Sequence, residues 1–504
     1  MRAFLASSIG VACAAALVLP LSGDAFADDT SLPGSTQSLR LGPLPPPERA
    51  SDAAQQGLLE RDVRPFSLLG VVWDDPDDEL HGTVQVRTRA TGTGAWSGWQ
   101  SVETHNHAHA ADPGSPERES GTVRGSTAPL WVGDSDGVEV RVRSEAPRAG
   151  ASAAPLPRGM RIELVDPGDD PPGQTDTGQA GTGQTGTGQT GTGQAPQTPA
   201  APGTAPVPGT DTTPVPGTDT PPVPGTDTPP APGSDTGTDT PPGTGTTTGT
   251  DTQQDPVAGA ALTVEEAASS AVNADLAPLG AFEIPELSKE ETEATIESEL
   301  AKPYIGPRPR IVTRKGWGAD EKLRERDFVY TKSVQAAFVH HSATGNNYTC
   351  KQAPSVLRSI YRYHVQSSGW RDIGYNFAVD KCGNIYEGRA GGVAKPVMGA
   401  HTLGFNSNSM GIAVLGTYSA STPPAASVTA IARLTAWKLG LYGKDPRGKA
   451  TLTSGGGNRY AKGTKVTLNV ISGHRDGFST DCPGARLYGK LGTARTASAK
   501  YQGR

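Results

Sequence analysis

Residues from about 170 to 255 contain almost nothing from which a folded core could be built. They are nearly all Gly, Thr, Pro, Gln, Ala and Asp, first in repeats of Gly-Gln-Thr-Gly-Thr and then of Pro-Val-Pro-Gly-Thr-Asp-Thr. Such a tract buries too little apolar surface to offset the conformational entropy lost on ordering. We therefore predict a disordered linker over 168–256, which separates two folded regions of the 504-residue chain.

The N-terminus has the order of a secretory signal peptide. Met1-Arg2 is followed by an apolar run from Ile9 to Leu21 and by Ala25-Phe26-Ala27, an A-x-A cleavage site. The run is shorter than the roughly 20 residues that a membrane span needs, which disfavours the alternative of a membrane anchor. We expect a signal peptide over 1–27 and a secreted product, extracellular or associated with the cell wall.

Charge argues against nucleic acid as a partner. The chain has 45 Lys and Arg against 52 Asp and Glu, a formal net charge of -7. The basic residues are scattered and are not gathered into a stripe with interleaved aromatic residues, as nucleic-acid binding requires. No later segment is apolar enough to predict a membrane span, and the oligomeric state stays open.

The region over 60–167 is predicted to be an all-β, sandwich-like domain. Short apolar runs alternate with Gly, Pro and Asp, and Gly137 to Arg143 alternates apolar and charged residues with period two. A short tract of His105, His107 and His109 falls between strands, where such histidines are expected to be solvated, so no metal is assigned to them.

Gly133-Asp134-Ser135-Asp136-Gly137 fits the G-x-S-x-G pattern, in which Ser135 would be the nucleophile of a secreted serine hydrolase. That motif needs a preceding strand and a following helix. Here a period-two strand follows, so a turn is predicted instead.

After the linker, an acidic segment over 257–305 carries two capping-box starts, at Thr263 and Ser288, and is predicted to be a helical linker. The region over 308–492 has a globular α/β pattern. Expected strands are 334–339, 376–380, 385–387, 410–415 and 465–471, and expected helices are 353–366 and 426–441.

Histidines at two strand ends and one cysteine suggest a metal site. His340-His341 ends one strand, His474 ends another, and Cys482 follows His474. Zinc takes about four tetrahedral N, S or O ligands, of which a catalytic site leaves one to water. Once Cys13 has left with the signal peptide, three cysteines remain, and a metal ligand would account for the odd one in an exported chain.

An ordered series of motifs from about residue 310 to 487 resembles the peptidoglycan recognition proteins, which are themselves similar to phage-type N-acetylmuramoyl-L-alanine amidases. The chain looks like a secreted bacterial member of this family. The motifs are Gly316–Ala319, Phe338–Ser342, Arg371–Phe377, Ile385–Arg389, Gly399–His401, Asn406, Met410–Ile412, Gly473–Asp476 and Asp481–Gly484.

The resemblance implies a mixed central sheet flanked by helices, a Zn²⁺ cofactor and peptidoglycan as the partner. The implied reaction is hydrolysis of the amide bond between N-acetylmuramic acid and the L-alanine of the stem peptide. The alternative is a non-catalytic peptidoglycan-binding module, because several family members bind without cutting. Those usually lack the cysteine ligand, so Cys482 favours catalysis.

Site residues follow from the resemblance position by position. His340, His474 and Cys482 would bind the metal, with His341 as a packing or hydrogen-bonding neighbour. Tyr375 and Thr480 would be catalytic. The groove would be lined or supported by His364, Trp370, Arg389, His401 and Asn406. With Cys482 on zinc, Cys350 and Cys382 are left for a disulfide.

Several points stay open. Tyr375, or a water held by Thr480 or His401, could protonate the leaving amine. Ala413 stands where a related branch has a general-base Glu, so no base is assigned there. Ala390-Gly391-Gly392 differs from the pairs that animal members use for the third stem-peptide residue, so that preference is open. The ligand of the N-terminal domain and a remodelling or lytic role are also open.

Overall fold

The computed structural model describes residues 34–44, 55–104, 106–145, 154–170, 262–296 and 302–504. All of them belong to one of the two units into which the chain divides. The predicted signal peptide and nearly all of the predicted linker lie outside the described residues. No helix in the described ranges is long and apolar enough to cross a membrane.

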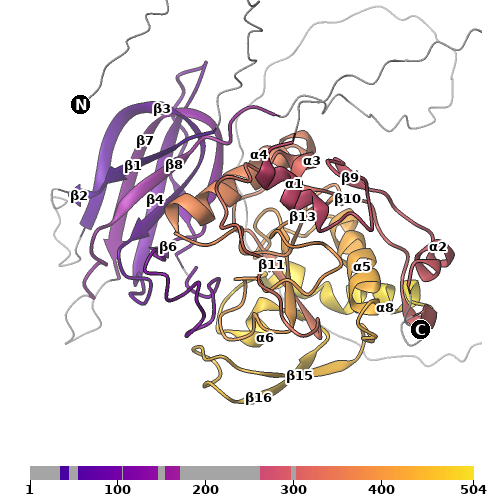
Figure 1. Cartoon of the computed structure of the whole chain (residues 1–504). Coiled ribbons are helices and arrows are strands. Elements are labelled where there is room, and N and C mark those ends of the chain that lie inside the picture. Colours follow the sequence, from indigo (N-terminus) through magenta and orange to yellow (C-terminus); the bar gives the residue numbers. More distant parts are fainter. Residues whose placement is uncertain (1–33, 45–54, 105, 146–153, 171–261, 297–301) are drawn as a thin grey trace, which may run out of the picture. The chain divides into compact units, whose positions relative to one another are not determined.

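The N-terminal part is all-β, as predicted, and its strands join one antiparallel sheet (Figure 1). The sheet order is β1-β8-β3-β7-β4-β5, and β2 and β6 also pair with β3. The strands are β1 Thr36–Arg40, β2 Gly42–Pro43, β3 Gln55–Trp73, β4 Gly82–Ala90, β5 Gln100–Val102, β6 Gly125–Ser126, β7 Leu130–Ser144 and β8 Arg161–Val165. Because β1 pairs with β8, the sheet includes residues before the predicted start at 60.

Residues 133–137 do not form the predicted turn. They lie inside β7, where Gly133 takes a φ of 74° and the pairing with β3 shifts register on either side of Phe66. A strand that continues past Ser135 offers no strand-to-helix elbow for a nucleophile. The serine hydrolase alternative therefore loses its structural basis.

Between β5 and β6, residues 106–124 form turns and irregular structure only. We call this segment the 106–124 loop. Its exposed tip includes Pro113 and Glu119, whereas Ala111, Glu117 and Val123 are buried. Buried residues in an irregular loop need partners elsewhere in the fold, and those partners lie in the C-terminal part.

The C-terminal part is built on a mixed seven-stranded sheet of order β17-β11-β14-β12-β13-β10-β9. β11 runs parallel to β14 and β17, β12 parallel to β14, and β10 parallel to β13, whereas β12 with β13 and β9 with β10 are antiparallel. The strands are β9 Glu283–Ile284, β10 Ile311–Val312, β11 Ala336–His341, β12 Phe377–Val379, β13 Ile385–Glu387, β14 Ser409–Val414 and β17 Ile471–Gly473, with a separate β15 Lys449–Thr453 and β16 Lys465–Asn469 hairpin.

Helices cover this sheet on both faces, which confirms the predicted class (Figure 1). Ile412 and Val414 of β14 share a buried cluster with Ile431 of α5, whereas Ala413 shares another with Val356 of α4. The helices are α1 Val264–Ala271, α2 Lys289–Ala294, α3 Arg314–Trp317, α4 Ala353–Arg362, α5 Ala425–Gly440, α6 His474–Gly477, α7 Ala485–Tyr488 and α8 Leu491–Tyr501, with short turns η1 Lys302–Tyr304, η2 Cys350–Gln352 and η3 Tyr363–Ser367.

The acidic segment does more than link. Both predicted capping boxes are present, at Thr263 before α1 and at Ser288 before α2. However, β9 pairs with β10 and extends the sheet, and Ile284 in β9 is fully buried. The prediction of a linker over 257–305 is corrected accordingly, because the described part of this segment is packed into the C-terminal fold.

A disulfide joins Cys350 and Cys382, as predicted, across a sequence separation of 32. It ties η2, just before α4, to the turn between β12 and β13. Closing a loop of this size stabilises the fold by about 3 to 4 kcal/mol in the chain-entropy model.

The two folded parts share an apolar core. Leu68 and Val72 of β3 lie in the same buried cluster as Val356 and Ile360 of α4. Burying one such side chain contributes about 1.5 to 3 kcal/mol. The sheet of the N-terminal part is therefore packed against α4, and this packing fixes where the 106–124 loop lies.

A close backbone approach marks this interface. A Cβ on Gly70 of β3 would lie 2.3 Å from the Tyr363 hydroxyl of η3, so only glycine fits. That hydroxyl donates a hydrogen bond of 3.1 Å to the Thr127 carbonyl. A buried tyrosine hydroxyl of the C-terminal part is thus satisfied by the backbone of the N-terminal part.

Candidate metal centre and groove

Parallel pairing brings the predicted ligands together. Val339 of β11 pairs with Gly473 of β17, so His340 and His474, which follow them, emerge at the same edge of the sheet. Cys482 lies beyond α6 and is buried beside them. The donor atoms of all three residues fall into one cluster.

The cluster has a fourth member that the sequence interpretation missed. His109 of the 106–124 loop joins His340, His474 and Cys482, and their donor atoms all lie within 4.8 Å of one another. The expectation that this histidine tract is solvated is wrong for His109, which is only 7% exposed. His107 is half-buried beside Glu79 at 3.0 Å, and residue 105 lies outside the described ranges.

Distances within the cluster suit a single metal ion. Cys482 Sγ lies 3.6 Å from His109 Nε2 and 3.7 Å from His340 Nδ1. Ligands on a tetrahedron with zinc bonds of 2.0 to 2.3 Å are roughly 3.5 Å apart. Thiolate sulfur and imidazole nitrogen are also the kinds of ligand that zinc takes in proteins.

Hydrogen bonds behind the rings orient them. His340 Nε2 lies 3.3 Å from His401 Nδ1, which leaves His340 Nδ1 toward the cluster. His474 Nε2 donates to the Ala108 carbonyl at 3.2 Å. Among the described residues, His474 Nδ1 is buried without a hydrogen-bond partner. His109 Nδ1 is also without one there, but it lies opposite the Nε2 that faces Cys482. A buried nitrogen such as His474 Nδ1, with a hydrogen bond from the opposite nitrogen of the same ring, is what a metal site provides.

Burial sets the protonation of the cluster. It lowers the pKa of His340 and His474 well below the usual value and that of His109 to about 3, so all three rings are neutral. Burial also raises the pKa of the Cys482 thiol. A thiolate in this position needs a cation to balance its charge, and the neutral rings are ready to bind one.

The two predicted catalytic residues lie in different settings. Tyr375 is buried, and its ring centroid lies 5.5 Å from that of His340. Burial raises the pKa of its phenol, which therefore keeps its proton. Thr480 is half-buried, and its hydroxyl accepts a hydrogen bond of 3.3 Å from the Cys482 amide. Thr480 therefore shapes the backbone turn that presents the cysteine.

His364, Trp370 and His401 lie around the cluster, behind the residues that form it. His364 stacks on Trp370 with a centroid separation of 4.3 Å and accepts a hydrogen bond from the Gly374 amide. His401 bonds to His340 and, at 3.0 Å, to the Thr402 hydroxyl. His401 is thus placed to orient a ligand. His341 takes the neighbouring role expected of it, because its Nδ1 accepts from the Tyr418 amide.

The remaining groove positions are engaged by the 106–124 loop. Arg389 forms two charge-assisted bonds, of 2.8 and 2.9 Å, with the Glu117 carboxylate. Asn406 Nδ2 donates to the Ala110 carbonyl and to Asp112 Oδ1, at 2.8 and 2.7 Å. Trp370 packs in a small buried cluster with Ala111, Val123 and Ala400. The loop therefore covers the predicted groove.

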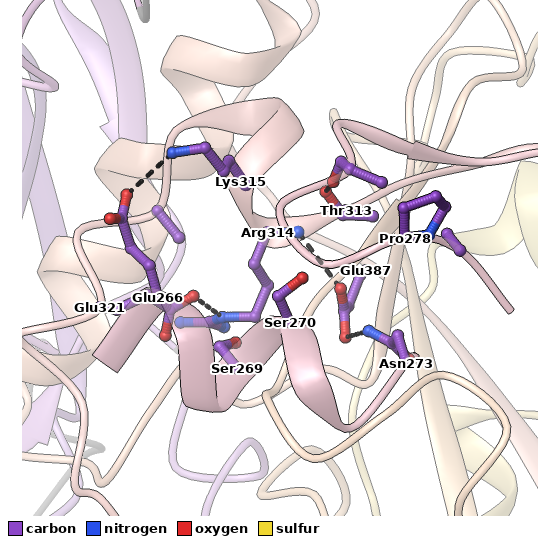
Figure 2. Close-up of a pocket in the computed structure, with 13 residues that line it drawn as sticks. Glu266, Ser269, Ser270, Asn273, Pro278, Thr313, Arg314, Lys315, Glu321 and Glu387 are labelled. Carbon is purple, nitrogen blue, oxygen red and sulfur yellow. Dashed lines mark hydrogen bonds and ion pairs between the residues drawn. The ribbon is translucent and has the colours of Figure 1, made fainter. Parts of the chain in front are cut away.

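A separate pocket lies under α1 and contains none of these residues (Figure 2). Glu387 of β13 accepts hydrogen bonds there from Asn273 Nδ2 at 2.8 Å and from the Arg314 amide at 3.2 Å. The Arg314 side chain pairs with Glu321 and Asp372. Burial raises the pKa of Glu387 to about 7. The charges in this pocket are paired within the fold, which indicates a structural network.

Both folded parts match known families. Residues 330–485 match the family model described as N-acetylmuramoyl-L-alanine amidase. Residues 28–160 match the one described as Rv3811 N-terminal galactose-binding domain-like.

Individual relatives resemble a part of this chain. The chain is 33% identical to peptidoglycan-recognition protein SC2 of Drosophila simulans over 185 residues, which are 36% of this chain and 85% of that protein. It is 31% identical to human N-acetylmuramoyl-L-alanine amidase over 218 residues, 42% of this chain and 32% of that protein. The solved structure of wild-type Drosophila PGRP-LB aligns over 36% of this chain and 93% of its own, at 26% identity and a TM-score of 0.30.

The amidase model covers residues 330–485, which include β11 to β17 and three of the four residues of the metal cluster. Through this region, the chain belongs to the family of peptidoglycan-recognition proteins and N-acetylmuramoyl-L-alanine amidases.

Proposed function

We propose that this protein is a secreted zinc amidase that hydrolyses the bond between N-acetylmuramic acid and L-alanine in peptidoglycan stem peptides. Family membership supports a peptidoglycan-related function. The observation that carries the catalytic assignment is the convergence of His340, His474 and Cys482 in one buried cluster beside Tyr375. A module that only binds has no need of a buried thiol among neutral imidazoles.

Zinc, when bound, acts as a Lewis acid and makes water nucleophilic near neutral pH. The residues of the chain supply the rest. The protonated phenol of Tyr375 is positioned to donate a hydrogen bond to the scissile carbonyl oxygen as negative charge develops on it. His401 is a positioning residue, because it acts on His340 through a hydrogen bond. The amine leaves with a proton from Tyr375 or from a water held nearby.

Secretion is part of the proposal. The Cys350–Cys382 disulfide supports it, because disulfides persist in oxidising compartments. The predicted signal peptide agrees with this. With Cys350 and Cys382 joined, Cys482 is the only free cysteine among the described residues.

Purified peptidoglycan incubated with zinc-loaded protein tests the activity. We expect new lactyl ends on muramic acid and new free amino groups on L-alanine, detected by mass spectrometry of the products. A chelator and the Cys482→Ala variant should both abolish them. Binding without cleavage, by zinc-loaded wild type and by the His109→Ala variant alike, would instead identify a binding module.

A further inference from the structure

We propose that His109 is the fourth protein ligand of the metal, supplied by the N-terminal part, and that the protein therefore rests in a closed form. The part of this proposal that concerns activity, namely that the closed form slows cleavage, rests on the proposed amidase function. The assignment of the ligand stands on geometry alone. In the closed form the 106–124 loop occupies both the metal site and the groove.

The number of protein ligands decides whether a zinc site is open to water. Zinc sites with four protein ligands are closed, whereas hydrolytic sites keep three and leave one position for water. His340, His474 and Cys482 make three. His109 Nε2 lies 3.6 Å from Cys482 Sγ, and the His109 ring centroid lies 4.4 Å from that of His474. His109 therefore occupies the corner that an attacking water needs.

Hydrogen bonds hold the 106–124 loop on both sides of His109. The Ala108 carbonyl accepts from His474 Nε2 and also from the Leu403 amide at 3.0 Å. Asp112 Oδ1 accepts from Asn406 Nδ2 and from the Gly404 amide at 2.8 Å. The residues on both sides of His109 are thus fixed by the rim of the metal site. A ring held from both sides is not an accidental neighbour.

Glu117 anchors the far end of the 106–124 loop. Glu117 is 2% exposed and pairs with the buried Arg389 through two hydrogen bonds, and it accepts a third from the Arg371 amide at 3.2 Å. A substrate carboxylate or carbonyl that used Arg389 would have to displace Glu117. Substrate binding and loop closure are therefore mutually exclusive at this side chain.

The 106–124 loop is built to open while both sheets stay folded. Its residues belong to no helix or strand, and the tip around Glu119 to Thr122 is exposed. Opening exchanges His109 for water at the metal and Glu117 for substrate at Arg389. A cut in the exposed tip would loosen the same contacts.

Cobalt substitution tests the ligand assignment independently of activity. Co²⁺ in the full chain should give the intense absorption of a four-coordinate site with a thiolate, and the spectrum should not respond to added azide. In His109→Ala protein the bands should change and should respond to azide, which takes the vacated position. His81→Ala, an exposed histidine of the same sheet domain, is the matched control and should behave as wild type.

Amidase assays on the same proteins test the closed state. We expect His109→Ala to cut peptidoglycan about tenfold faster than wild type or His81→Ala, because the closed population is removed. Glu117→Gln, which loosens the anchor and keeps every ligand, should also raise the rate. Glu119→Gln in the exposed tip is its control and should not.

The outcomes separate the two proposals. An unchanged cobalt spectrum in folded His109→Ala protein, with azide sensitivity already present in wild type, would overturn the ligand assignment. A changed spectrum with no faster cleavage in His109→Ala or Glu117→Gln would overturn the closed state. A changed spectrum with no cleavage by any variant, including after prolonged incubation, would overturn the amidase function and leave His109 as a ligand.

Discussion

Cys482 and Tyr375 set the chemistry at the scale of single residues. The thiol is buried among neutral imidazoles, and its pKa is raised by that burial. The phenol is buried beside the same rings and keeps its proton. The Cys482 thiol therefore needs a bound cation to ionise, whereas the Tyr375 phenol can donate a hydrogen bond. Replacing Cys482 should therefore remove the activity together with the metal ligand, whereas replacing Tyr375 should lower kcat and leave the zinc content nearly unchanged.

Tyr375→Phe removes the phenolic donor and leaves the ring. We expect kcat to fall by about 10² to 10³, the cost of one oxyanion-hole donor, with zinc content and thermal stability nearly unchanged. Steady-state kinetics on a soluble muropeptide measures this change in kcat. Both proteins also carry His109→Ala, so that the groove is open. Tyr501→Phe in α8 is the control for the same chemical change, and a rate equal to it would remove Tyr375 from catalysis.

Elements place these residues by rules that are partly visible in sequence. An apolar run over 410–415 predicted β14, and an amphipathic pattern over 426–441 predicted α5, each to within a residue of its observed bounds. Both patterns are local signals in the sequence. The strand before the histidines was predicted over 334–339 and is observed as β11 Ala336–His341. Very short strands such as β9 and β10 carry too few residues to show a period, so they were missed.

The disulfide belongs to this scale, since it joins η2 to the β12–β13 turn. Replacing Cys350 and Cys382 together by Ser should lower the free energy of unfolding by about 3 to 4 kcal/mol. The zinc content should stay the same, because the metal uses Cys482. Urea unfolding with parallel metal analysis measures both quantities. Loss of bound zinc from the folded double variant would mean that these cysteines reach the metal.

Glu387 of β13 should make the free energy of unfolding depend on pH. Its folded pKa of about 7 lies above that of a carboxyl in an unfolded chain, so the folded state binds the proton more tightly. Its contribution to stability is complete below the unfolded pKa and is lost as pH rises through about 7. The loss amounts to about 3 kcal/mol at most.

Chemical unfolding at a series of pH values compares wild type with Glu387→Gln. The variant keeps one acceptor and cannot ionise, so its stability should fall less between pH 4.5 and 7. Glu290→Gln, on the exposed face of α2, is the control and should follow wild type. Parallel curves for wild type and Glu387→Gln would show that Glu387 does not titrate in this window.

At the scale of the whole molecule, the important contacts join residues far apart in the chain. His109 meets His474 across 365 positions, Glu117 meets Arg389, and Gly70 meets Tyr363. Motifs located His340, His474 and Cys482, because each lies in an ordered local pattern. No local pattern shows that a loop between two strands of one domain enters the groove of another. The histidine tract was visible, but its partner was not.

Gly70 tests whether the packing of the two parts matters. Gly70→Ala would place a Cβ 2.3 Å from the Tyr363 hydroxyl, so the shared core must shift. We expect a loss of about 1 to 3 kcal/mol in unfolding free energy, typical of overpacking. Gly42→Ala, where a Cβ meets nothing within 4 Å, is the control. Equal stability of the two variants would show that the interface yields without cost.

X-ray absorption at the zinc edge of the loaded full-length protein tests the central claim most directly. A metal held by His340, His474, Cys482 and His109 should show one sulfur at about 2.3 Å together with nitrogen neighbours at about 2.0 to 2.1 Å. The sulfur should disappear in Cys482→Ala protein. A wild-type shell of nitrogen and oxygen alone would contradict the account, because the thiolate would then play no part in holding the metal.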